Sequence, residues 1–195
     1  MQILKPLTVA TVLGSLTACA VAPTLEEREA SYVALSEQHF TDTLNIVDDP
    51  LNPSIEIDTR AGHRDYVFSW ELQNDQFLRA FVARESGSVS LQAYVRTQIP
   101  GVFLRGTSVT FAHTMETRAV DRIGFDANCS GGRCINSEDV VFSITVDELS
   151  AAVEEAERRA ERTLVFRIQG QSGRDRDGRF HIEEARAMLS ALERF

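Results

Sequence analysis

Apolar and polar side chains alternate most regularly between residues 78 and 99. The inward positions of a first arm run at every second residue from Leu78 to Val82. After a turn at residues 85–88, those of a second arm run from Val89 to Ile99, with polar residues between them. A period of two is typical of a strand with one buried and one solvated face. The segment therefore predicts an antiparallel hairpin.

Shorter alternating segments predict further strands on both sides of this hairpin. In one of them, Tyr66, Phe68 and Trp70 share a face. Residues 48–53 are rich in aspartate, asparagine and proline and predict a loop. The other predicted strands cover residues 54–59, 65–71, 102–111, 117–126, 139–146 and 163–169.

Three segments have helical periodicity instead. Thr24 with Glu27, and Thr145 with Glu148, have the capping-box spacing that satisfies the first free N–H groups of a helix. They predict helices over residues 24–39 and from 145 to about 162. A third helix is expected over residues 181–194, after a polar turn that follows residue 169.

The order of these segments predicts the fold class. Strands follow one another without alternating helices, which favours antiparallel pairing. We expect an α+β fold, namely a mainly antiparallel β meander or sandwich with an N-terminal helix and two C-terminal helices. Residues 24–195 would form a single domain of ordinary size.

Composition narrows the function classes. The 195 residues include 20 basic and 29 acidic ones, giving a net charge of −9. Nucleic-acid binding needs a basic face, so we expect no nucleic-acid partner. The apolar content of 43% is that of a globular protein.

The first residues have the form of an export signal. One cation, Lys5, precedes a mostly apolar run from Leu7 to Leu16. Ten helical residues span about 15 Å, which is too short to cross roughly 30 Å of hydrocarbon. The run therefore predicts a cleaved secretory signal rather than a membrane span.

The next residues, Leu16-Thr17-Ala18-Cys19, resemble the lipobox of bacterial lipoproteins. The resemblance covers residues 1–19, and we recognise no characterised family in the rest of the chain. It implies that residues 1–18 are removed and that Cys19 carries acyl chains, such as palmitate, that anchor the protein to a membrane. Because Ala20 rather than aspartate follows the cysteine, it implies the outer membrane with the domain facing the periplasm, although a Gram-positive surface fits the peptide too. Residues 19–23 form a tether, and its four residues after Cys19 reach at most about 14 Å.

Two further cysteines lie five positions apart. Cys129 and Cys134 enclose two glycines that allow a tight turn. In an oxidising compartment we expect a disulfide between them. The alternatives are a zinc site, which lacks paired histidines nearby, and a redox site, which lacks the usual spacing of two residues.

Signatures of common enzymes are absent from the sequence: there is no nucleophile elbow, P-loop, zinc-protease motif or dinucleotide fingerprint. We therefore expect no enzymatic activity and no cofactor. A weak calcium candidate remains, since Asp175, Asp177 and Glu184 match three ligand positions of an EF-hand loop. Gly173 at the first ligand position and the arginines around the aspartates, Arg174, Arg176 and Arg179, favour a simple helix-capping turn instead.

Two functional hypotheses follow. The first is a non-enzymatic binding or assembly module of the envelope, with Tyr94 and Arg96 on the solvated face of the long hairpin as contact residues and an envelope protein complex as partner. The second is a periplasmic small-ligand binder or hydrolase with a site on the sheet face near Trp70.

Overall fold

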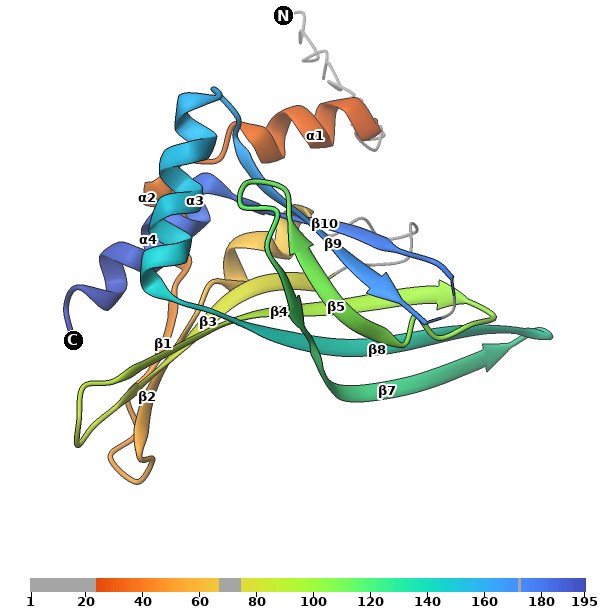
Figure 1. Cartoon of the computed structure of the whole chain (residues 1–195), viewed down its shortest axis with the longest axis horizontal. Coiled ribbons are helices and arrows are strands. Elements are labelled where there is room, and N and C mark those ends of the chain that lie inside the picture. The colour runs from red at the N-terminus through yellow and green to blue at the C-terminus, as the bar shows by residue number, and fades with distance from the viewer. Residues whose placement is uncertain (1–23, 67–74, 172) are drawn as a thin grey trace, which may run out of the picture.

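The computed structural model describes residues 24–66, 75–171 and 173–195 (Figure 1). Its helices are α1 (Leu25–Val33), α2 (Glu37–Thr43), α3 (Val146–Arg158) and α4 (Ile182–Leu192), with a 3-10 helix η1 (Arg60–Tyr66). Its strands are β1 (Asn45–Val47), β2 (Ser54–Asp58), β3 (Asp75–Ala83), β4 (Val89–Pro100), β5 (Gly106–Phe111), β6 (Thr117–Ala119), β7 (Asp121–Ser130), β8 (Arg133–Ile144), β9 (Thr163–Gly170) and β10 (Arg176–His181). The α+β class is confirmed.

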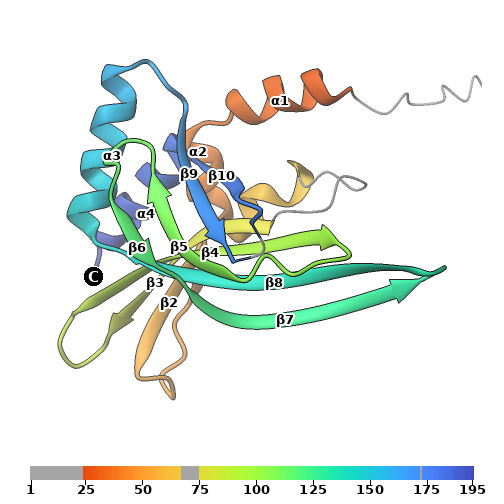
Figure 2. The ribbon, with the colours of Figure 1, turned by 45° about the vertical axis from the view of Figure 1, so that its right-hand side comes forward.

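These strands form two antiparallel sheets. The first has the order β1-β2-β3-β4-β8-β7, and the second has the order β10-β9-β5-β6. The chain leaves the first sheet after β4, adds β5 and β6 to the second, and returns through β7 and β8. Figures 1 and 2 show the second sheet and the helices on one side of the first sheet, whose other side is open.

One hydrophobic core joins both sheets to the C-terminal helices. The alternating positions expected to point inward on β3 and β4, such as Leu78 and Ala93, are fully buried. They meet Phe166 of the second sheet, Leu149 of α3 and Met188 of α4 in one cluster. The alternation in the sequence therefore identified the buried face of the first sheet correctly.

The N-terminal helix differs from the expectation, because residues 24–39 do not form one helix. The capping box of Thr24 and Glu27 is present, but α1 ends at Val33. The side chain of Ser36 then accepts a hydrogen bond from the backbone N–H of His39 and caps a second helix, α2. The N-cap at Ser36 starts a new helix, so the single helix predicted over residues 24–39 is divided into two.

The prediction of a strand over residues 65–71 is wrong for its first two residues. Residues 60–66 form the 3-10 helix η1, which begins where an Asp58 carboxylate oxygen accepts from the Arg60 N–H. Phe68 and Trp70 lie outside the described residues. The loop expected at residues 48–53 is present, and the short strand β1 precedes it.

The polar turn expected after residue 169 is present but shorter than predicted, because residues 176–181 form β10. This strand pairs with β9 along its length, from Arg176 opposite Ile168 to His181 opposite Thr163. Of its alternate positions 176, 178 and 180, only Phe180 carries a large apolar side chain. The Cβ that any other residue would add at Gly178 would lie 2.2 Å from the Phe166 ring. Close packing therefore requires a glycine where an alternating pattern would show an apolar residue, and the sequence pattern does not reveal the strand.

Strands β7 and β8 form a long hairpin, which we call the arm. Ser130 pairs with Arg133, so Gly131 and Gly132 alone make the turn. Their φ angles of 59° and 77° are the left-handed values that a two-residue hairpin turn requires. The strand expected at residues 139–146 thus begins earlier, at Arg133, and the one expected at 117–126 is divided into β6 and β7.

Candidate functional site

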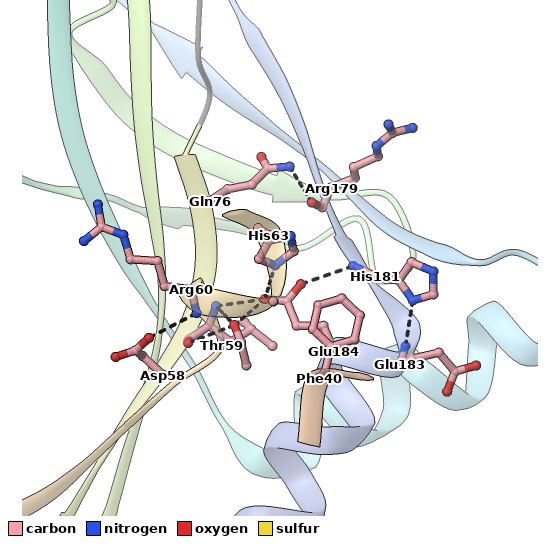
Figure 3. A network of polar contacts seen from close by, with 12 residues as sticks. Phe40, Asp58, Thr59, Arg60, His63, Gln76, Arg179, His181, Glu183 and Glu184 are labelled. Carbon is pink, nitrogen blue, oxygen red and sulfur yellow. Dashed lines mark hydrogen bonds and ion pairs between the residues drawn. The ribbon is translucent and has the colours of Figure 1, made fainter. Parts of the chain in front are cut away.

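A buried polar network lies where α4 meets β3 and η1 (Figure 3). At its centre is Glu184, whose side chain is fully buried. One carboxylate oxygen accepts from the Thr59 hydroxyl at 2.5 Å and from the Leu78 N–H at 3.2 Å. The other accepts from the His181 N–H at 3.3 Å. One carboxylate thus connects three segments that are far apart in the sequence.

His181 begins α4 as an unusual N-cap. Its Nδ1 accepts from the Glu183 N–H at 3.1 Å, so the ring is neutral with its proton on Nε2. Nε2 lies 3.3 Å from the Val33 carbonyl oxygen, which accepts that proton's hydrogen bond. Burial lowers the pKa of His181, which keeps Nδ1 available as an acceptor.

His63 is the second histidine of the network. Its Nε2 lies 3.1 Å from the same Glu184 oxygen that binds Thr59, but it makes no aligned hydrogen bond. The contact is an ion pair when the His63 ring is protonated. Burial favours the neutral ring, yet the Glu184 carboxylate outweighs burial and raises the pKa of His63.

Aromatic rings enclose both histidines. Phe40 is fully buried, with ring centroids 5.3 Å from His63 and 5.7 Å from His181. Tyr32 meets His181 edge-on at 5.3 Å. Burial raises the pKa of Tyr32. Thr59 and Glu184 are inaccessible to solvent and His63 is 8% exposed, so the geometry is that of a structural junction rather than of groups presented to a substrate.

The predicted contact residues lie on the face of the first sheet that points away from the core. Tyr94 stacks on Phe77 with ring centroids 4.6 Å apart. Arg96 donates two hydrogen bonds to Asp139 on β8, at 2.7 and 2.9 Å. Burial and the Asp139 carboxylate raise the pKa of Tyr94 to about 12. Tyr94 and Arg96 are thus held in place by neighbours in the sheet, and their role as contact residues stays a prediction.

The structure does not bring the weak calcium candidates together. Asp177 forms a two-pronged pair with Arg167, at 2.6 and 2.9 Å. Asp175 accepts from the Gly170 N–H at 3.4 Å, while Glu184 points into the interior. Within the part of the chain that the structure describes, no group of three His, Cys, Asp or Glu side chains could hold a metal ion.

Cys129 and Cys134 face each other near the tip of the arm. Their sulfur atoms lie at disulfide distance, with Cα atoms 4.0 Å apart. Sequence reasoning found this pair through its spacing and its glycines. Cys19 and Trp70 lie outside the described residues, so the lipid anchor and the ligand site near Trp70 stay predictions.

Strand β7 forms the solvent-exposed side of the arm. All ten residues of β7 are exposed except Gly124, which is half-buried. The exposed side chains include Ile123 (52%) and Phe125 (69%), and Ile135 of β8 is exposed by 38%. β7 is the last strand of its sheet, so one edge of its backbone has no partner strand among the described residues.

Comparisons with protein-family models, with curated proteins and with solved structures find no match. Among the described residues, no helix is long and apolar enough to cross a membrane.

Proposed function

We propose that this protein is a lipid-anchored envelope lipoprotein that acts as a non-enzymatic binding or assembly module, with the arm as its contact element. The lipobox of residues 16–19 supports the anchor. The paired Cys129 and Cys134 agree with an oxidising compartment outside the cytoplasm.

The exposure of the arm carries the proposal. An edge strand with unpaired N–H and C=O groups accepts an extended segment from another chain, and natural proteins usually shield such edges. A bulge at Ile123 interrupts the register with β8, but pairing is continuous from Gly124 to Ser130. This leaves a regular edge to which an extended partner segment can add.

Exposed apolar side chains on the arm define what the partner must offer. Phe125 lies edge-on against Phe103, with ring centroids 5.9 Å apart, and still exposes 69% of its surface. Isolated apolar residues are common on surfaces, but neighbouring ones such as Ile123 and Phe125 on the edge strand are typical of a contact site. The occupant we propose is an extended segment of an envelope protein with apolar side chains at alternate positions.

The placement of the arm fits an anchored module. In both ribbon views, the N-terminal end of α1 and the tip of the arm lie on the same side of the molecule (Figures 1 and 2). With a tether of at most about 14 Å between Cys19 and the folded domain, the arm would extend toward the membrane that holds the anchor. Its partner would then be a membrane-associated or membrane-embedded protein.

Site-specific photocrosslinking in intact envelopes tests the contact. A photoreactive residue at Phe125 should capture one envelope protein, and the same residue at Leu51, a 90% exposed side chain of the β1–β2 loop, should not. The purified partner should bind the full chain and lose about tenfold or more in affinity with Phe125→Ser. Equal capture at both positions, or equal affinity of the variant, would contradict the proposal.

Fractionation tests the anchor separately. The chain with Cys19→Ser should leave the membrane fraction, and mass spectrometry of the wild-type N-terminus should find acyl chains on Cys19. If the variant stays with membranes and the wild-type terminus carries no lipid, the lipoprotein assignment is wrong.

A further inference from the structure

A polar hollow lies at the base of the arm, between β7 and the second sheet. Its volume is about 360 Å³, and it is lined by Arg105, Gly106, Val120, Arg122 and Gln171. We infer that this hollow binds a phosphate-type oxyanion through the guanidinium groups of Arg105 and Arg122 and the side-chain amide of Gln171. The inference goes beyond the proposed contact function and does not depend on it.

The charge balance around the hollow supports an anionic ligand. None of the lining residues is acidic. Within the described part of this acidic chain, most arginines form salt bridges, whereas Arg105 and Arg122 form none. The Arg122 guanidinium instead lies 5.4 Å from the centroid of the Phe125 ring. Two cations without a carboxylate partner at one hollow can pair with an anion from outside the chain.

The backbone at Arg105 gives a second, independent reason. Its φ angle is 52°, a left-handed conformation that costs energy for any residue with a Cβ. This turn directs the successive N–H groups of Arg105 and Gly106 to the buried carboxylate of Glu138, both at 2.8 Å. Glycine would meet that requirement without strain. An arginine in a position suited to glycine indicates that its side chain has a use there.

The same turn positions Gln171. The Arg105 carbonyl oxygen accepts from the Gln171 N–H at 3.1 Å, which ties the β9–β10 connection to the start of β5. Glu138 is 1% exposed and its oxygens are occupied by the two N–H groups. Its carboxylate therefore pairs with the backbone of the turn and forms no salt bridge with the Arg105 or Arg122 guanidinium group.

The chemistry of the lining selects the class of ligand. Guanidinium groups bind phosphate oxygens in paired, charge-assisted hydrogen bonds, and an amide adds a neutral donor. A space of this size suits a single phosphoryl group with a small substituent. The group could be supplied by a free phosphate ester or by the headgroup of an anionic lipid.

Titration of the full chain in neutral detergent with inorganic phosphate tests the site. The amide resonances of Gly106 and Gln171 should shift and saturate. Arg122→Gln should weaken binding about tenfold or more, since a charge-assisted contact is lost. Arg133→Gln, the same change on an exposed arginine at the tip of the arm, should leave the affinity unchanged.

Arg105→Gly separates binding from folding. The glycine keeps the N–H groups that hold Glu138 and removes only the side chain. We expect weaker phosphate binding, by about tenfold or more, with a melting temperature equal to or above that of the wild type. Weaker binding in a protein of unchanged or higher stability cannot be attributed to unfolding.

Two further titrations distinguish the sources of the phosphate. Tighter binding of glycerol phosphate than of micelles doped with phosphatidylglycerol would support a soluble ester, and the reverse order would support a lipid headgroup. Phosphatidylcholine micelles are the zwitterionic control. No saturable shift with any phosphate ligand, or equal losses in Arg133→Gln and Arg122→Gln, would overturn the inference.

Discussion

At the scale of single residues, Glu184 is a buried side chain that joins distant parts of the interior. It sits at the third position of α4, where a glutamate normally completes a capping box, and it also reaches Thr59 and Leu78 across the core. A buried carboxylate is stable only when its oxygens are satisfied, and here they are.

Replacing this carboxylate is therefore expected to be costly. In either orientation, Glu184→Gln places its amide NH2 against a hydrogen-bond donor. These are the Thr59 hydroxyl and the Leu78 N–H in one orientation, and the His181 N–H in the other. The free energy of unfolding should fall by about 2–4 kcal/mol in urea denaturation. The control is Glu155→Gln on α3, which breaks ion pairs with Arg158 and Arg159 and should cost far less stability, because solvent screens these exposed pairs. Similar losses in the two variants would contradict a special role for Glu184.

His63 should make the stability of the protein depend on pH. Its pKa is raised in the folded state by Glu184, so the folded protein holds a proton that the unfolded chain releases near pH 6.5. The resulting stability is fully present below about pH 6.5 and is lost as the pH rises through the higher folded-state pKa. His181, whose pKa is lowered, acts below pH 6.5 and does not disturb this range.

Urea denaturation at a series of pH values above 6.5 measures the effect. The wild type should lose stability with rising pH, and His63→Gln should lose much less over the same range. A variant with the slope of the wild type would show that another group is responsible. The low-pH limb, where His181 titrates, should be shared by both proteins and serves as the internal control.

At the scale of elements, the arm combines high exposure with a covalent closure at its tip. Closing a loop of six residues stabilises by about 2 kcal/mol on the chain-entropy estimate. Because β7 contributes almost no buried side chains, we expect the disulfide to stabilise the end of the hairpin rather than the core.

Opening the disulfide should therefore act locally. With Cys129→Ser and Cys134→Ser, backbone amides of residues 126–137 should exchange with deuterium faster. Amides around Val140 and Leu91, which are buried in the core, should exchange at the wild-type rate. Faster exchange throughout the sheet would instead mean that the arm and the core unfold together.

Elements with a regular apolar face could be predicted from the sequence. Where the prediction failed, a local packing or capping requirement interrupts the alternation of apolar and polar residues. The hairpin of β3 and β4 and the helix α3 each bury a complete stripe. In β10, close packing requires Gly178 where the pattern needs an apolar residue. At Ser36, a side-chain cap divides a segment whose periodicity continues.

The polar network could be found only in part. Spacing alone placed Glu184 in a possible calcium loop with Asp175 and Asp177. That interpretation assumed a flexible turn before the helix, whereas β10 runs directly into α4 and directs Glu184 into the interior. The partners Thr59 and Leu78 lie more than 100 residues away, and no local pattern links them. The capping box of Thr145 and Glu148, by contrast, could be predicted because its two residues are only three positions apart in the sequence.

At the scale of the whole molecule, the succession of strands without helices between them predicted antiparallel pairing. It did not predict the order of the strands within each sheet. β8 pairs with β4 across the segment that builds β5, β6 and β7. Local alternation states which face of a strand is buried, not which strand lies beside it. The two sheets share one core, so neither can be completed without the other.

The place of α4 in that core constrains how the chain is made. The segment around Thr59 and Leu78 obtains its buried hydrogen-bond acceptor from a helix that starts only at residue 182. A polypeptide emerging from the ribosome N-terminus first holds nearly all of its strands before this acceptor exists. Until α4 is made, Thr59 and Leu78 can bond only to each other, and the carboxylate that joins them to the C-terminal helix is missing. A chain that ends before Glu184 would contain every described strand but lack most of the α4 side chains that complete the shared core.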